Sequence, residues 1–172
     1  MMIGVLIVMS GLPGAGKSAI AHALAQELTA PVFSVDPIEA AIWRCGIPPS
    51  FQTGVAAYEV AAVLAEQQLG LGLTAITDSV SSLEVAREMW RRAAARTERD
   101  LAIIEVICSD EHRHRERLAR RQRDIPGFPE PLWADVEERR AEWEPWMEEH
   151  LVVDTAQSLD SNVGDVLAYV RR

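Results

Sequence analysis

Gly11-Leu12-Pro13-Gly14-Ala15-Gly16-Lys17-Ser18 is the stretch of sequence that decides the fold, because it has the spacing G-x-x-x-x-G-K-S/T of a phosphate-binding loop. Its flanks support this interpretation. Residues Ile3–Met9 form a short apolar run that predicts a buried strand, and Ser18–Leu28 carries apolar residues at helical spacing. In a loop between strand and helix, backbone N–H groups and the helix N-terminus point at phosphate oxygens. The alternative is a glycine-rich turn that matches the pattern by chance.

The residues of this loop have distinct expected roles. Lys17 is expected to reach the β- and γ-phosphates of ATP as a catalytic residue, and the Ser18 hydroxyl is expected to ligate Mg²⁺. Lys17 is also the only lysine in the chain, and a compact ammonium suits a crowded phosphate site better than a planar guanidinium. The expected nucleotide-binding residues here are Gly11, Leu12, Pro13, Gly14, Ala15, Gly16, Lys17, Ser18 and Ala19.

The composition limits the class of protein. With 172 residues, of which 48% are hydrophobic and 25% charged, the chain is expected to form one domain spanning residues 1–172. Cys45 and Cys108 are too few for a disulfide framework, so a reducing, cytoplasmic location is expected. The net charge of -9 argues against a broad nucleic-acid surface, because duplex binding depends on phosphate neutralisation. The Ile3–Met9 run is too short to span a membrane.

Predicted strands alternate with predicted helices along the chain. The strands are Ile3–Met9, Val32–Val35, Leu73–Thr77, Leu101–Ile107 and Leu151–Val153. The helices are Ser18–Leu28, Gly54–Leu69, Leu83–Thr97, Glu111–Arg123, Leu132–Trp143 and Leu159–Val170, and Pro37 is expected to end a strand and start a further helix. This alternation predicts an α/β fold with a five-stranded parallel sheet and helices on both faces. Ligands of such sheets bind at the carboxyl ends of the strands.

Aspartates follow several of the predicted strands. Asp36 comes after the second strand, Asp78 after the third and Asp154 after the last. An aspartate in this place is often only a helix N-cap, which contributes about 1 kcal/mol. Because Asp36 and Asp78 are expected at the sheet edge that carries the phosphate loop, the sequence favours a chemical role for these two.

An arginine-rich segment follows the fourth predicted strand. It contains Arg113, Arg115, Arg117, Arg120, Arg121 and Arg123, with few apolar residues, and it precedes the proline-rich stretch 125–131. We interpret residues 112–131 as a short helical lid whose guanidinium groups contact phosphates. The alternative is a solvated helix face. The neighbouring Trp133, Trp143 and Trp146 are expected to be packing residues, and contact of one of them with a substrate is the alternative.

Together these motifs resemble the P-loop small-molecule kinases of the nucleoside-monophosphate-kinase fold, which include shikimate kinase, gluconate kinase and chloramphenicol phosphotransferase. The resemblance extends to bacterial chains labelled AAA-family ATP-binding proteins. It covers the whole length, through GLPGAGKS, Val35-Asp36, ITDSV at 76–80, ERLARR at 116–121 and VDTA at 153–156. It implies a three-layer P-loop NTPase fold with a short helical lid.

The resemblance also implies roles for individual residues. Asp36 accepts or orients the proton of the substrate hydroxyl, and Asp78 holds Mg²⁺ through water. In the lid, Arg117 packs on adenine and Arg121 reaches the phosphates, while the loop Asp154–Ala156, with Thr155 at its centre, touches the adenine edge. The chain departs from the pattern at one point: many relatives have an arginine within three residues of the Asp36 equivalent, but the nearest arginine here is Arg44.

The sequence therefore predicts an ATP- and Mg²⁺-dependent phosphotransferase that acts on a hydroxyl of a small molecule, with Lys17, Asp36 and Arg121 as its catalytic residues. Residues 37–70 are expected to cap the substrate pocket. Two alternatives remain open. One is an ATP-driven regulatory switch without an acceptor, and the other is a polynucleotide 5′-hydroxyl kinase, which would need a basic, aromatic groove.

Overall fold

Five parallel strands form a single sheet at the centre of the molecule. The computed structural model describes residues 4–171, so Ile3 of the first predicted strand lies outside the described residues. The strands are β1 (Leu6–Ser10), β2 (Val32–Ser34), β3 (Ala75–Asp78), β4 (Leu101–Ile107) and β5 (Leu151–Asp154), in the spatial order β2-β3-β1-β4-β5. The strand β1, which leads into the glycine-rich loop, therefore lies in the middle of the sheet.

The sheet is buried on both faces, as its apolar strands predict. Leu6 and Val8 of β1 belong to one apolar cluster, and Ile7 and Met9 belong to the other. All four side chains are fully buried. Because successive side chains of a strand point to opposite faces, one continuous apolar run supplies both cores.

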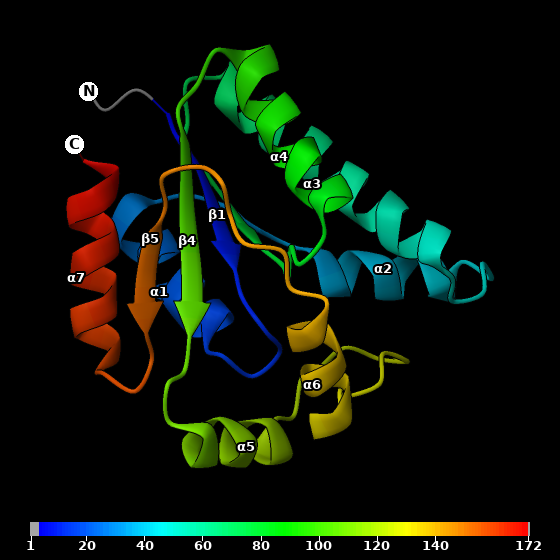
Figure 1. Cartoon of the computed structure of the whole chain (residues 1–172). Coiled ribbons are helices and arrows are strands. Elements are labelled where there is room, and N and C mark those ends of the chain that lie inside the picture. The colour runs from blue at the N-terminus through cyan, green and yellow to red at the C-terminus, as the bar shows by residue number, and fades with distance from the viewer. Residues whose placement is uncertain (1–3, 172) are drawn as a thin grey trace.

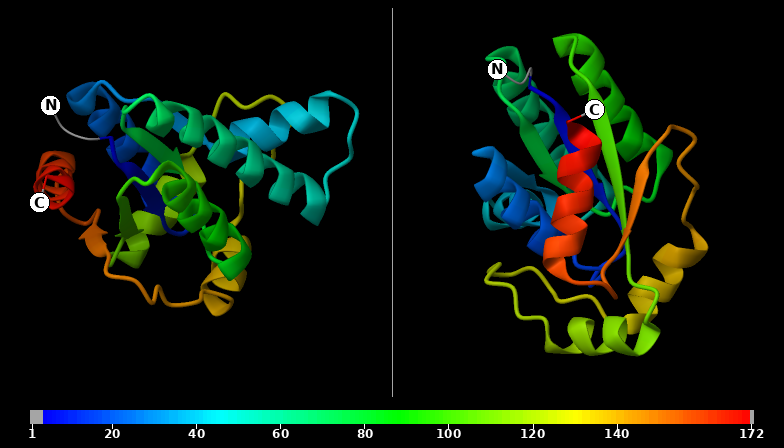
Figure 2. Two further views of the ribbon diagram at one scale, coloured as in Figure 1. Left: turned by 90° about the horizontal axis from the view of Figure 1, so that it is seen from above. Right: turned by 90° about the vertical axis from the view of Figure 1, so that its left-hand side faces the viewer.

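The helices form a layer on each side of the sheet. The seven helices of residues 4–171 are α1 (Lys17–Leu28), α2 (Val35–Arg44), α3 (Phe51–Gly70), α4 (Glu84–Thr97), α5 (Glu111–Arg120), α6 (Trp133–Ala141) and α7 (Leu159–Val170). Helices α1 and α7 pack together on one face, and α3 packs on α2 and α4 over the other (Figures 1 and 2). This arrangement confirms the predicted three-layer α/β fold. No helix within the described range is both long and apolar enough to cross a membrane.

Most predicted bounds differ from the structure by a few residues, and two of these differences concern residues near the site. The strand β2 ends at Ser34 and α2 begins at Val35, two residues before Pro37. Pro37 fits in the first helical turn because the N–H groups there have no intrahelical partner. The helix predicted over Glu111–Arg123 ends at Arg120, and Arg121 has extended backbone angles.

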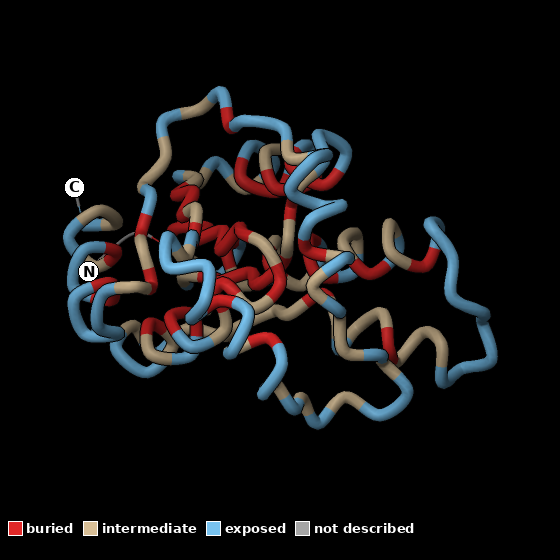
Figure 3. The backbone as a smooth tube through the Cα atoms, turned by 60° about the horizontal axis from the view of Figure 1, so that its bottom comes forward, coloured by how far each residue is buried: buried red, intermediate tan, exposed pale blue. Residues whose placement is uncertain are grey.

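The elements at the carboxyl edge of the sheet are α5, α6 and the connecting loop at residues 121–132 (Figure 1). Figure 3 shows buried residues gathered in the middle of the molecule with exposed residues around them, and residues 121–132 are all exposed or half-buried. These segments lie beside the glycine-rich loop, which α5 contacts through His114.

A buried arginine fixes the segment before β5 to the rest of the fold. Arg87 of α4 is 1% exposed, and its Nε donates to the Ser81 carbonyl at 2.9 Å. Its Nη atoms donate to the carbonyls of Pro145 and Glu144, and the guanidinium lies 4.1 Å from the centre of the Trp146 ring. The charge is thus satisfied by backbone carbonyls rather than by a carboxylate partner.

We expect Arg87→Ala to lower the free energy of unfolding by about 3 kcal/mol or more, because it leaves buried carbonyls without donors and opens a cavity. The control is Arg92→Ala on the same helix, whose side chain is 44% exposed and pairs only with Glu59. That substitution should cost less than about 1 kcal/mol. Urea unfolding followed by circular dichroism measures both, and equal losses would contradict the role of Arg87.

Candidate functional site

The glycine-rich loop has a conformation that only glycine permits at two of its positions. Gly11 has φ 149° and Gly16 has φ 107°. A Cβ atom on Gly11 would lie 2.3 Å from the Val106 carbonyl oxygen, and one on Gly16 would lie 2.9 Å from Cγ2 of Thr155. The loop is therefore pressed against β4 and the end of β5, and its glycines are required by packing as well as by backbone angle.

Lys17 lies at the first position of α1, inside the curve of the loop. Its side chain is 7% exposed, and Nζ donates to the carbonyls of Gly11 at 2.8 Å and Leu12 at 3.0 Å. Burial lowers the pKa of Lys17, and the carboxylates of Asp78 and Asp36 act in the opposite direction. No side chain caps the N-terminus of α1, so its first N–H groups face the loop without a capping partner.

Ser18 and Asp78 meet beside Lys17. The Ser18 Oγ donates to Asp78 Oδ2 at 2.6 Å, and the Asp78 side chain is almost fully buried at the end of β3. Across residues 4–171, no three His, Cys, Asp or Glu side chains gather as a metal site. A hydroxyl with a single carboxylate nevertheless fits Mg²⁺, which retains water ligands and takes others from substrate phosphates. Ser18 and Asp78 are therefore the residues that would hold this ion.

Helix α5 packs directly on the loop, although its sequence contains few apolar residues. His114 is 2% exposed and its Nε2 lies 2.7 Å from the Pro13 carbonyl oxygen, while Leu118 is also buried. Because a carbonyl only accepts hydrogen bonds, Nε2 carries the proton. Burial lowers the pKa of His114, which favours the neutral form of the ring.

Arg117 joins the last loop of the sheet to α5. Its Nη1 donates to Thr155 Oγ1 and its Nη2 donates to the Thr155 carbonyl, both at 2.7 Å. The Thr155 Oγ1 donates in turn to the Ala15 carbonyl at 2.7 Å. The structure thus brings Arg117, Thr155 and the glycine-rich loop together, as the family resemblance implies for an adenine-binding corner.

Asp36 lies across the opening from these residues, in the first turn of α2. It forms an ion pair with Arg123, which also pairs with Glu130 at 3.1 Å. Arg121 lies beside them, and burial together with the charge of Arg123 lowers its pKa. The sequence analysis missed Arg123 as a site residue. The one signal in the sequence was that no arginine lies close to Asp36 along the chain, which indicates that its cationic partner comes from elsewhere. The loop after α5 supplies this partner through Arg123.

The helix-cap alternative is wrong for all three aspartates that follow strands. The N-caps of α2, α4 and α7 are Ser34, Leu83 and Ser158. Asp154 instead accepts hydrogen bonds from the backbone N–H groups of Ser109 and Ala156. It braces the loop that carries Thr155, whereas Asp36 and Asp78 face the opening of the glycine-rich loop.

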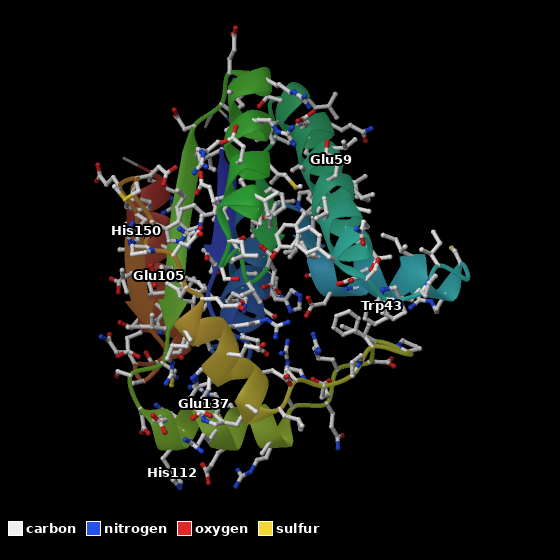
Figure 4. All side chains as sticks on the ribbon, turned by 45° about the vertical axis from the view of Figure 1, so that its right-hand side comes forward. Trp43, Glu59, Glu105, His112, Glu137 and His150 are labelled. Atoms are coloured by element: carbon white, nitrogen blue, oxygen red, sulfur yellow. The ribbon has the colours of Figure 1, made fainter. Side chains whose placement is uncertain are left out.

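A cavity of about 930 Å³ connects these groups. Lys17, Ser18 and Asp78 line one end, and Asp36, Arg121 and Arg123 line the middle. At the other end, Trp43 of α2 stacks on Phe128 of the loop after α5, with ring centres 4.7 Å apart (Figure 4). The cavity therefore runs from a cationic phosphate-type site to an aromatic wall.

Trp90, Trp133 and Trp146 make packing contacts, as was expected for Trp133 and Trp146. Trp90 is fully buried, and its Nε1 donates to Ser81 Oγ at 3.0 Å. Trp146 is buried against Arg87, and Trp133 meets His114 edge-on with ring centres 5.1 Å apart. Trp43 is the only tryptophan of the described chain among the residues that line the large cavity.

The chain belongs to the family described as an AAA domain, whose AAA_33 family model matches residues 6–142. A sugar kinase from Janibacter sp. HTCC2649 is 18% identical with a TM-score of 0.72, over 98% of this chain and 95% of that chain. A gluconokinase from Sinorhizobium meliloti 1021 is 20% identical with a TM-score of 0.70, over 100% and 94%. Kti12 from Chaetomium thermophilum, solved with ADP-AlF3, is 17% identical with a TM-score of 0.71, over 96% and 98%. No curated protein sequence matches the chain.

These comparisons confirm the resemblance to P-loop kinases of the nucleoside-monophosphate-kinase fold. At these levels of identity, the structural likeness establishes the fold. The role of each side chain has to be argued from the site itself.

We expect Lys17→Ala to weaken binding of ATP–Mg²⁺ by about 10- to 150-fold, which corresponds to the roughly 1.5–3 kcal/mol typical of hydrogen bonds to charged groups. The chain has no second lysine to replace it. Arg96→Ala, which removes one exposed positive charge on α4, is the control and should leave affinity unchanged. Isothermal titration calorimetry measures both, and unchanged affinity in Lys17→Ala would remove the phosphate-site assignment.

Proposed function

We propose that the protein is an ATP- and Mg²⁺-dependent phosphotransferase that transfers the γ-phosphoryl group to a hydroxyl of a small molecule. The observation that carries this proposal is the single cavity that holds Lys17 and the Ser18–Asp78 pair at one end and Asp36 with Arg121 in the middle. In-line transfer requires a phosphate cradle, a metal site, a positioned nucleophile and cationic groups around the transferred phosphoryl. The cavity contains a candidate for each.

The nucleotide would lie along the glycine-rich loop. Its phosphates would replace the Gly11 and Leu12 carbonyls as partners of Lys17 Nζ, and the adenine would lie at the Arg117–Thr155 corner. Mg²⁺ would be held by Ser18 and, through water, by Asp78, and it would supply charge neutralisation at the β- and γ-phosphates. Lys17 and Arg117 thus lie on the nucleotide side of the site.

The transfer step follows from the position of Asp36. The acceptor hydroxyl oxygen forms a bond to the γ-phosphorus while the bond to the β–γ bridging oxygen breaks and ADP leaves. The hydroxyl proton passes to Asp36. Arg123 binds Oδ2 of Asp36, and Oδ1 accepts no hydrogen bond from any described residue. Oδ1 is therefore the atom that would receive the proton, while Lys17 and Arg121 stabilise charge on the transferring group.

Two segments have roles in this proposal. Residues 37–70, which include most of α2 and all of α3, would form the acceptor side of the cavity, and residues 112–131 would form a lid over the phosphates. The Arg123–Asp36 ion pair and the Trp43–Phe128 stack both join the lid to the acceptor side. Closure of the lid and positioning of the candidate base would thus occur together.

The alternative of an ATP-driven switch shares the nucleotide end of the cavity, and Kti12 shows that this fold occurs with bound ADP-AlF3 outside the proteins described as kinases. A switch has no use for a carboxylate held beside an aromatic wall. Nucleotide hydrolysis that is slow and insensitive to every alcohol tested would favour the switch. The polynucleotide kinase alternative needs a basic groove, whereas the chain carries a net charge of -9.

We expect Arg121→Ala to lower kcat more than it weakens nucleotide binding, because the charge it would stabilise develops during transfer. Arg117→Ala should mainly raise the KM for ATP, since Arg117 contacts Thr155 at the proposed adenine corner. Arg120→Ala serves as the control, because Arg120 is largely exposed on the same helix. Steady-state kinetics separate these effects, and changes within about twofold for both Arg121 and Arg117 would contradict the lid role of residues 112–131.

We expect Asp36→Asn to lower the transfer rate by about 10²- to 10⁴-fold, because asparagine keeps the shape and accepts a hydrogen bond from Arg123 but cannot take a proton. ATP affinity should barely change, since Asp36 lies across the cavity from the adenine corner. Asp124→Asn is the matched control, because Asp124 also lines the cavity but forms no ion pair with a described residue. Product formation by mass spectrometry gives the rates, and a near wild-type rate for Asp36→Asn would exclude Asp36 as the base.

A further inference from the structure

The acceptor end of the cavity has an unusual balance of charge. Arg123 pairs with Asp36 and Glu130, and Arg121 lies beside them. Glu39 lines the same cavity and forms no ion pair with any described residue, although the charge of Arg139, which also lines the cavity, acts on it. Glu39 is therefore a carboxylate that a cationic group of the acceptor can reach.

Glu39 is held in a defined position. It lies one helical turn after Asp36 on α2, and its Oε1 accepts a hydrogen bond from Thr53 Oγ1 at 3.0 Å. Thr53 is buried and also accepts a hydrogen bond from Trp43 Nε1 at 3.1 Å. Residues three apart on a helix have Cβ atoms about 5–6 Å apart, so Glu39 and Asp36 can contact two groups of one small molecule.

The walls around Glu39 are aromatic and aliphatic. Trp43 and Phe128 stack with an interplanar angle of 8°, and Phe51 and Val55 of α3 line the same end. Phe51 is 66% exposed, although large apolar side chains are usually covered. A ring of the acceptor would cover this surface, and the aromatic faces would also attract a cation.

We propose that the acceptor is a ring-bearing alcohol that carries a basic amine, with its hydroxyl at Asp36 and its amine at Glu39. This proposal rests on the proposed phosphotransferase function. Burial raises the pKa of Glu39 in the free protein, and a bound ammonium group would favour its ionised form. The transfer step itself is the one given above, with the hydroxyl as nucleophile and the amine as an anchor only.

The test uses three probes of one shape and different charge: meta-(aminomethyl)benzyl alcohol, its N-acetyl derivative and meta-(hydroxymethyl)phenylacetate. Binding to the protein saturated with a non-hydrolysable ATP analogue is measured by calorimetry, and transfer from ATP is measured by mass spectrometry. The amine probe should bind at least about tenfold more tightly than the other two. Equal binding of the three, no binding, or preference for the carboxylate would overturn the proposal.

Glu39→Gln tests the assigned residue. Its amide oxygen still accepts from Thr53, so the local structure should persist, and the preference for the amine over the N-acetyl probe should fall to within about twofold. Glu59→Gln is the control, because Glu59 lies on the outer side of α3 and pairs with Arg92 (Figure 4). A preference unchanged in Glu39→Gln would overturn the assignment.

In this experiment, binding tests the acceptor class and transfer tests the phosphotransferase function. Binding in the order amine, N-acetyl, carboxylate without any phosphorylated product would support the acceptor class and overturn the phosphotransferase function. Transfer to the carboxylate probe alone would support the phosphotransferase and overturn the acceptor class.

Discussion

The site depends on the backbone of the glycine-rich loop being held from outside by residues distant in the sequence. Thr155 Oγ1 donates to the Ala15 carbonyl, and the neutral His114 ring donates to the Pro13 carbonyl. Both contacts donate hydrogen bonds to backbone carbonyl groups of the loop. Because Gly11 and Gly16 bring the loop within van der Waals contact of β4 and Thr155, its conformation is set before any phosphate arrives. A loop that already has its binding conformation does not need to reorganise when charge develops during a reaction.

Local sequence determines most of the fold. The bounds of β4 and α7 were predicted to the residue, since both have clear signals: a continuous apolar run in β4, and helical periodicity after Ser158, which caps α7 through its side chain. The start of α2 and the end of α5 were predicted wrongly because helix propensity does not determine either bound. Pro37 is tolerated inside the first turn of α2, and the chain after Arg120 is extended although its sequence continues the arginine-rich pattern of α5.

The candidate site also contains some residues that local sequence predicts and others that it does not. Lys17, Ser18 and Asp78 follow from a motif and from the rule that ligands bind at strand ends, and the structure places all three together. The partners of Asp36 do not follow from any local pattern. Arg123 is 87 residues away in sequence, and the Trp43–Phe128 stack joins α2 to a loop that has no helical or strand periodicity. Long-range pairs of this kind are set by tertiary packing, which a single sequence does not display.

The charged side chains of this acidic protein are distributed unevenly around the cavity. Under the proposed function, the nucleotide end places Lys17 and Arg121 at a site for phosphates, so its local charge is opposite to that of the whole protein. At the acceptor end, Asp36 pairs with Arg123, and Glu39 forms no ion pair with a described residue. Because the two ends share one cavity, this difference in charge would favour phosphates at the first end and a cationic group at the second. The acidic side chains that argue against a nucleic-acid groove would thereby help to orient two small substrates.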